Sequence, residues 1–201
     1  MSETTRTRRP VGERVLDATA TITVEHGWGA VTMGKVAALA GVSRQTVYNE
    51  YGAKPALGQA MVLRELERFL AVVAHELDTG DELVPAIRAA AEQTLLMARD
   101  NPLLHTVLTS AHSVSSGGSQ ADNELLPFLT TDAEPLISAA KSVIIERLGR
   151  FPDLGFDGEQ LDAATDAIVR LVLSHVMQPG DDPARTADHL AWIVGRVLAR
   201  S

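Results

Sequence analysis

The residues best suited to chemistry lie close together between positions 44 and 49. Five polar side chains occupy this segment, namely Arg44, Gln45, Thr46, Tyr48 and Asn49. An arginine can form two hydrogen bonds with guanine, a glutamine or asparagine can do the same with adenine, and a threonine methyl can contact the methyl group of thymine. These residue types therefore predict hydrogen bonding to base edges in the major groove of DNA.

Two short helices joined by a tight turn would position these side chains. Thr32 can cap a helix over residues 33–40, whose expected apolar face consists of Val36, Ala37, Leu39 and Ala40. Gly41 follows at a position where a left-handed backbone is inexpensive for glycine only. Ser43 can cap the second helix two residues later. The turn is thus predicted to comprise residues 41–43.

The second helix has one apolar side and one polar side. Val47 and Tyr51 are four residues apart and share a face with Val42 toward the first helix. The polar residues 44–46, 48 and 49 remain available on the outside. An ordinary helical hairpin without DNA contacts is the alternative interpretation.

This segment resembles the amino-terminal domain of TetR-type (tetracycline-repressor-like) regulators over about residues 13–57. The shared features are Thr32, Val36-Ala37, Ala40-Gly41-Val42-Ser43, the aromatic pair Tyr48 and Tyr51, and Lys54 opening a long helix. The resemblance implies a three-helix helix-turn-helix DNA-binding domain, expected over residues 1–54. It also implies a larger helical domain for ligand binding and dimerisation over residues 55–201. The expected DNA contacts are Thr32, Lys35, Ser43, Arg44, Gln45, Thr46, Tyr48, Asn49 and Lys54.

Glu50 departs from the family pattern. A carboxylate facing phosphates would weaken DNA binding, so we expect Glu50 to point away or to pair with a base.

The distribution of charge supports the division into two domains. Residues 1–55 carry seven Lys and Arg against five Asp and Glu, whereas the whole chain has a net charge of −8, which leaves −10 on residues 56–201. Only the first part is a plausible polyanion surface.

The basic arm of Arg6, Arg8 and Arg9 precedes Pro10 and has no apolar partner. It can touch a phosphate or the minor groove, or it can be a disordered solubilising tail; the sequence leaves both open.

Composition limits the class of protein. The 201 residues contain no Cys, which excludes disulfides, thiolate metal sites and a Cys nucleophile. No apolar run follows the basic arm, and Arg170 and His175 interrupt the most apolar window, residues 167–177. We therefore expect a cytoplasmic protein with no membrane partner.

Ala and Leu are abundant and alternating strand patterns are absent, so an all-α fold of about nine helices is expected. The first of these spans about residues 12–25, and Trp28 in the loop after it is expected to fill the core of the small domain. Beyond the hairpin, helices are expected over about residues 55–77, 85–99, 102–112, 134–148, 158–177 and 183–200.

The last two helices are apolar on more than one side, so one face can meet the same subunit and the other can meet a partner. A four-helix seam would give an isologous homodimer that reads a near-palindrome, as the resemblance also implies. The alternative is a fully buried helix in a monomer. The expected interface residues are Leu173, Val176, Met177, Leu190, Ile193, Val194 and Val197.

Helices between the two ends supply candidate residues for an effector pocket, although core packing is the ordinary explanation for each of them. These residues are Phe69, Val73, Thr94, Leu95, Leu104, His105, Leu108, His112, Phe128, Ile144, Leu171 and His175. Such an apolar site would suit a hydrophobic small molecule such as a fatty acid or its thioester. Two of its polar residues, His105 and His112, are seven residues apart, too far for paired metal ligands on one helix, so no metal and no cofactor is expected.

The sequence lacks the marks of an enzyme: it has no Gly-rich phosphate loop, no paired catalytic carboxylates and no nucleophile elbow. A helical interaction or ligand-binding protein without DNA activity is the remaining rival. The favoured hypothesis is a ligand-responsive transcriptional regulator, most simply a repressor, that binds a palindromic double-stranded operator as a dimer. Entry of the effector would release it from the operator.

Overall fold

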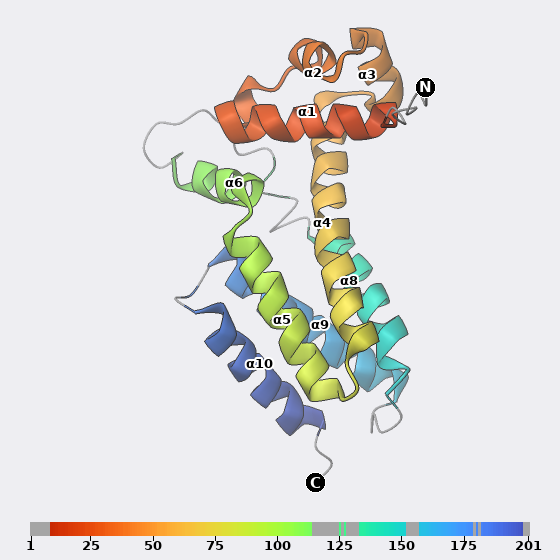
Figure 1. Ribbon diagram of the computed structural model, residues 1–201, viewed down its shortest axis with the longest axis vertical. Coiled ribbons are helices and arrows are strands. Elements are labelled where there is room, and N and C mark those ends of the chain that lie inside the picture. The colour runs from red at the N-terminus through yellow and green to blue at the C-terminus, as the bar shows by residue number, and fades with distance from the viewer. Residues whose placement is uncertain are drawn as a thin grey trace, which may run out of the picture. The chain divides into compact units, whose positions relative to one another are not determined.

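The computed structural model is all-helical (Figure 1). It describes residues 9–113, 125, 127, 133–151, 157–178, 180 and 182–198, and side chains are described for all of these except 110–113, 197 and 198. Within these residues it contains nine α-helices and one 3₁₀ helix. The predicted fold class is therefore confirmed.

The ends of the helices agree with the expected ones to within two or three residues. The last helix is expected to end at residue 200, and residues 199 and 200 lie outside the described part of the chain. In order they are α1 (Val11–His26), η1 (Trp28–Ala30), α2 (Met33–Ala40), α3 (Arg44–Tyr51), α4 (Lys54–Thr79), α5 (Leu83–Arg99), α6 (Pro102–Ser113), α8 (Glu134–Leu148), α9 (Gly158–Met177) and α10 (Pro183–Leu198). Local capping explains several boundaries. At the start of α9, for example, Asp157 and Gln160 each accept a backbone hydrogen bond from the other, at 2.9 and 3.2 Å.

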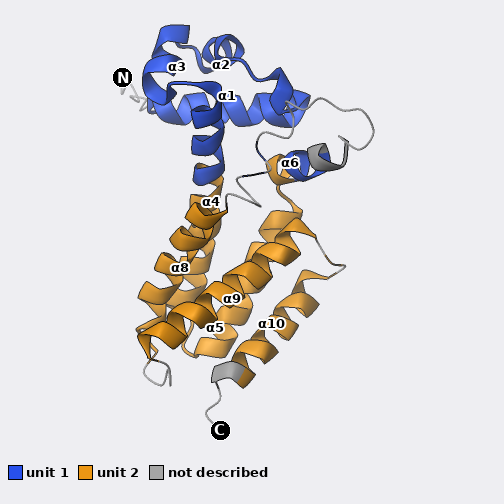
Figure 2. Ribbon diagram, turned by 180° about the vertical axis from the view of Figure 1, so that it is seen from behind, with its two compact units in different colours: residues 1–63, 105–127 blue, residues 64–104, 128–201 orange. Residues whose placement is uncertain are grey.

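The chain packs as two compact units (Figure 2). The first unit comprises residues 1–63 and 105–127, and the second comprises residues 64–104 and 128–201. The division therefore falls within α4, and a segment distant in sequence joins the first unit. The boundary expected between residues 54 and 55 concerns function rather than packing, and it stays a prediction.

The core of the first unit forms where α1 packs against α2 and η1, and where α2 packs against α3. Val15, Val36 and Val47 are fully buried there, and Trp28 is 2% exposed, as expected for a side chain that fills this core. Leu39 is an exception, because it is 57% exposed although the sequence placed it on the apolar face of α2. At 100° per residue it lies well around the helix from the buried residues of α2, so this assignment was wrong.

Gly58 of α4 is required by close packing in the first unit. A Cβ atom at this position would lie 2.8 Å from the Trp28 ring and 2.8 Å from Leu125 Cδ2. Leu125 is itself 1% exposed. The indole and this leucine therefore press directly on the backbone of α4, which only a glycine permits.

The second unit is a layered helical body in which α5 packs against α9 and α10, and α8 packs against α9. Among the residues described in this unit, apolar side chains form three clusters. The largest contains Leu95 of α5, Val176 of α9 and Leu190 of α10. Exposed ion pairs join the same helices, as between Arg88 Nε and Asp188 Oδ1 at 2.6 Å.

Candidate nucleic-acid interface

The turn between α2 and α3 has the geometry that the sequence predicted. The Thr32 side chain accepts a hydrogen bond from the Lys35 backbone N–H at 3.2 Å. Gly41 adopts φ +64° and ψ 42°, the left-handed conformation that favours glycine. Ser43 Oγ then accepts from the Thr46 backbone N–H at 3.0 Å. Both helices are thus capped by their own side chains, and the turn fixes the angle between them.

Two residues anchor α3 within the first unit. Val47 is completely buried, and the Tyr51 hydroxyl donates a hydrogen bond to the Gly12 carbonyl of α1 at 3.0 Å. Because these residues lie four apart, they fix one face of α3 and leave the opposite face toward solvent. The helix is therefore held rigidly enough to present its outer side chains in a defined order.

The outer face of α3 carries the polar side chains that the sequence predicts at the DNA. Arg44, Gln45, Tyr48 and Asn49 are exposed, and Thr46 is half-buried. They are paired along the helix: Arg44 Nη2 donates to the Tyr48 hydroxyl at 3.2 Å, and Gln45 Nε2 donates to Asn49 Oδ1 at 2.8 Å. These exposed i,i+4 contacts order the side chains and can be exchanged for contacts with bases.

Glu50 turns away from this face, as expected. Its Oε1 atom lies 3.2 Å from the point where a Cβ on Gly12 would be, in the first turn of α1. A helix N-terminus carries partial positive charge, which suits a carboxylate. The single acidic residue of α3 is thereby removed from the surface that Arg44 occupies.

Lys54 has a structural role that the sequence did not reveal. Its ammonium group donates to the Trp28 carbonyl at 3.0 Å and lies 4.8 Å from the centroid of the indole ring. Lys35, which is exposed, likewise donates to the Ala30 carbonyl at 3.1 Å. Two of the lysines expected at phosphates therefore also hold η1 in place.

The arginine arm is described only from Arg9 onward. Arg9 Nη1 forms an exposed ion pair of 2.8 Å with Asp17 of α1. Arg6 and Arg8 lie outside the described residues.

Those residues of the predicted effector pocket that the structure describes are distributed over several apolar clusters, and their assignment to a ligand site stays a prediction. Phe69, Leu95, Leu104 and Leu171 belong to one apolar cluster of the second unit, whereas Val73 packs in another and Ile144 contributes to that one and to a third. Leu108 is half-buried in the first unit. Phe128 and the side chain of His112 lie outside the described residues.

The side chain of His105 is exposed among the described residues, and its assignment to the ligand site stays a prediction. Sequence reasoning placed it by the apolar residues beside it on α6, yet its own position on the helix faces solvent.

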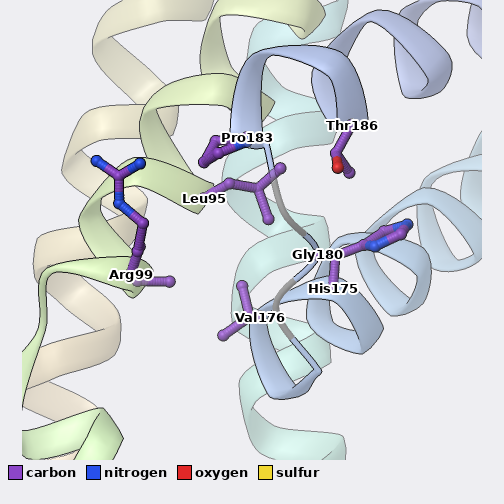
Figure 3. Close-up of a pocket in the computed structure, with 8 residues that line it drawn as sticks. Leu95, Arg99, His175, Val176, Gly180, Pro183 and Thr186 are labelled. Carbon is purple, nitrogen blue, oxygen red and sulfur yellow. The ribbon is translucent and has the colours of Figure 1, made fainter.

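A small hollow lies among α5, α9 and α10 (Figure 3). Leu95 and His175, both predicted ligand residues, line it together with Pro183 and Thr186. It has room for about one water molecule, which is too little for an organic effector. The hollow alone therefore does not form an effector site.

The predicted dimer residues divide into buried and exposed ones. Val176, Leu190 and Val194 are at most 8% exposed within their own subunit, so they offer little surface to a partner, and their assignment to the dimer interface stays a prediction. Leu173 is half-buried and packs against a cluster that contains Ile137 and Ala140 of α8. Met177 is also half-buried. The side chain of Val197 lies outside the described residues. Of the predicted set, Ile193 remains accessible at 40% exposure.

Trp192 is the surface residue that the interface prediction omitted. It is 64% exposed, and the guanidinium of Arg196 lies 5.7 Å from the centroid of its ring. The signal was present in the sequence, because Asp188, His189 and Arg196 share the face of α10 on which Trp192 lies. Trp192 and its neighbour Ile193 are the large apolar side chains exposed on the described part of α10.

Two general observations restrict the chemistry. The described residues contain no group of three or more His, Asp or Glu side chains placed to bind a metal ion. None of the helices described combines the length and apolar character needed to cross a membrane.

Known proteins resemble both parts of the chain. Residues 15–61 match the model for bacterial regulatory proteins of the tetR family, and residues 82–196 match the model for a bacterial tetracyclin repressor C-terminal domain. The HTH-type transcriptional regulator AlkX of Mycobacterium tuberculosis is 31% identical over 185 residues, which cover 90% of this chain and 82% of that protein.

Solved structures agree with this relationship. The TetR family repressor AlkX from Dietzia sp., implicated in biodegradation of n-alkanes, is similar with a TM-score of 0.74 and 26% identity, covering 95% of this chain and 96% of that one. RolR in complex with resorcinol has a TM-score of 0.59 at 16% identity over 92% and 87% of the two chains, which shows a shared fold only.

The matches span the helix-turn-helix and the helical body alike, and they are matches to regulators rather than to enzymes. The chain therefore belongs to the TetR family of helix-turn-helix transcriptional regulators.

Proposed function

We propose that this protein is a dimeric repressor that binds a palindromic operator and leaves it when a hydrophobic small molecule binds the helical body. The observation that carries the proposal is the rigid display of α3, whose outer face is polar and basic while its inner face is fixed by Val47 and Tyr51. Family membership implies that the protein binds a DNA operator.

The DNA contacts divide by chemistry. Arg44, Gln45, Thr46 and Asn49 have the donors, acceptors and methyl group that read base edges. The backbone of DNA is held by the remaining members of the set, Thr32, Lys35, Ser43, Tyr48 and Lys54. Phosphate contacts fix the register of a protein on DNA, and base contacts supply specificity.

A second copy of the chain would complete the operator-binding form. Trp192 and Ile193 are exposed on one side of α10, and exposed large apolar side chains on a soluble helix favour burial against a partner. A symmetric dimer presents the same surface twice, so two recognition helices can enter successive major grooves, about 34 Å apart.

The effector proposed is a hydrophobic molecule, such as a fatty acid or an acyl thioester. Support comes from the apolar clusters of the second unit and from the similar AlkX repressor of Dietzia sp., which is implicated in biodegradation of n-alkanes. Because α4 is one continuous helix from the first unit into the second, displacement of its distal half would move the DNA-binding half with it. The spacing of the recognition helices would then no longer match the operator, and affinity would fall.

The test is a footprint of the purified protein on the DNA upstream of its own gene, followed by titration of the complex with long-chain acids and thioesters. We expect saturable, salt-sensitive protection of a near-palindrome and release by one of these ligands. Absence of any footprint would contradict the DNA-binding proposal. Protection that persists with every hydrophobic ligand would contradict the effector proposal alone.

A further inference from the structure

Thr94 of α5 has a buried hydroxyl with no hydrogen-bond partner among the described residues. Its side chain is 8% exposed, and the Oγ1 atom is inaccessible to solvent. Other helical threonines satisfy their hydroxyls on their own backbone. Thr19 donates to Val15, Thr23 to Thr19 and Thr165 to Leu161, each over one turn and at 2.8 Å. Thr94 could do the same with Ala90 and does not.

The surroundings of this hydroxyl are small and apolar. The residues one turn before and after it on the same face of α5 are Ala90, Ala91 and Ala98, all buried. Phe69 and Leu171 pack against the cluster that contains Ala91 and Ala98, and both keep some exposure. Thr94 is thus a single polar residue on a face of α5 made of alanines, and apolar side chains from α4 and α9 pack against the cluster that includes these alanines.

A buried hydroxyl without a partner is unfavourable, and a ligand that supplies an oxygen or a hydroxyl hydrogen removes the penalty. A neutral oxygen fits better than a carboxylate, because a buried carboxylate needs a cationic partner and the threonine offers only a dipole.

We propose that Thr94 hydrogen-bonds the oxygen-bearing end of a neutral long-chain molecule, such as a primary alcohol, whose hydrocarbon chain lies along the alanine face of α5. This inference rests on the proposed function, since it specifies the head group of the hydrophobic effector. It also gives the ligand a means of acting. The alanine face is closely packed, so an entering chain separates α5 from Phe69 and hence displaces α4.

The test compares Thr94→Val with Thr165→Val, because valine keeps the shape of threonine and removes the hydroxyl. Thr165 is a matched control: it is 1% exposed in the same unit, but its hydroxyl is bonded to the Leu161 carbonyl. Binding of 1-dodecanol and of n-dodecane would be measured by calorimetry on the full chain, and thermal unfolding would be measured without ligand.

For Thr94→Val we expect 1-dodecanol to bind about 5- to 10-fold more weakly, as for one lost hydrogen bond, and n-dodecane to bind unchanged. Its melting temperature should be equal to or above that of the wild type, because an unsatisfied group is removed. Thr165→Val should melt lower and keep the wild-type ratio of the two affinities. Thr94→Ser, which keeps the hydroxyl, should bind the alcohol in preference to the alkane as the wild type does.

Three results would overturn the inference: an unchanged alcohol-to-alkane ratio in Thr94→Val, failure of the wild type to bind 1-dodecanol, or tighter binding of dodecanoate than of the alcohol. Operator binding of each variant without ligand is recorded in parallel. Loss of operator binding by the wild type would contradict the proposed function, whereas the affinity ratio tests the role of Thr94 only.

Discussion

Replacement of Arg44 by alanine tests the base-reading role of α3 most directly. Arg44 is exposed at the first position of the helix, and within the described part of the chain its guanidinium contacts Tyr48, through the 3.2 Å hydrogen bond and a ring contact of 5.4 Å. It packs on no core residue, so Arg44→Ala should leave the melting temperature within a degree or two of the wild type.

The expected loss of affinity follows from the contacts exchanged. A bidentate arginine–guanine pair contributes about 1–3 kcal/mol of discrimination. The arginine must give up its contact with Tyr48, which at an exposed site is worth about 0.5–1 kcal/mol. The alanine variant has no such contact to give up, so the net loss should be about 0.5–2 kcal/mol, or roughly 2- to 30-fold.

The assay is fluorescence anisotropy with the footprinted operator and with a scrambled duplex of the same composition, at several salt concentrations. Arg44→Ala should weaken binding to the operator and leave the scrambled duplex nearly unaffected. Arg68→Ala is the matched control, since it removes the same charge from an exposed arginine of the second unit, paired with Glu65 at 2.6 Å. An equal loss on both duplexes, or an equal loss in the Arg68 variant, would refute the base-reading assignment.

Three further predictions concern other parts of the chain. Lys54→Ala should lower the melting temperature, because the Trp28 carbonyl loses its donor. It should also weaken binding to all DNA sequences equally and reduce the slope of log affinity against log salt concentration by about one. An unchanged slope would mean that Lys54 has a structural role only. Trp192→Glu should place a charge in the proposed dimer surface and yield a monomer in analytical ultracentrifugation with a weaker operator complex, and a variant that stays dimeric would exclude this surface. The hydrogen bond from Arg170 lowers the pKa of Asp166, so the ion pair stabilises the fold above the ordinary carboxyl pKa of about 3.9, and this contribution is lost as pH falls through the lowered value. Asp166→Asn should therefore reduce thermal stability slightly at pH 7 and at low salt, and the difference from the wild type should shrink as the pH falls through the lowered pKa of Asp166; a difference that stays constant as the pH is lowered would contradict this cause.

Local chemistry explains why the DNA-binding part could be predicted. The cap at Thr32, the left-handed turn at Gly41 and the cap at Ser43 each depend on a few neighbouring residues, so their types and spacing were sufficient. The inward face of α3 followed from the spacing of Val47 and Tyr51 in the same way. Leu39 was misassigned because hydrophobic character was counted without its exact angle around the helix.

Contacts between distant residues could not be predicted in this manner. No pattern in the sequence indicates that Lys54 binds the Trp28 carbonyl, or that Leu125 packs against Gly58 in the first unit. Both pairs are separated by many residues, and their formation depends on how whole helices pack.

The amino-acid sequence by itself therefore determined the helical class, the helix boundaries and the order of side chains along the recognition helix, because hydrogen bonds within four residues and a 3.6-residue period govern them. Only the tertiary structure decided which apolar residues of α9 and α10 serve the core and which remain exposed. It also revealed that the buried hydroxyl of Thr94 has no hydrogen-bond partner among the residues that the structure describes. Burial depends on which helices lie on each side of a residue, and this information is not contained in its immediate neighbours along the chain.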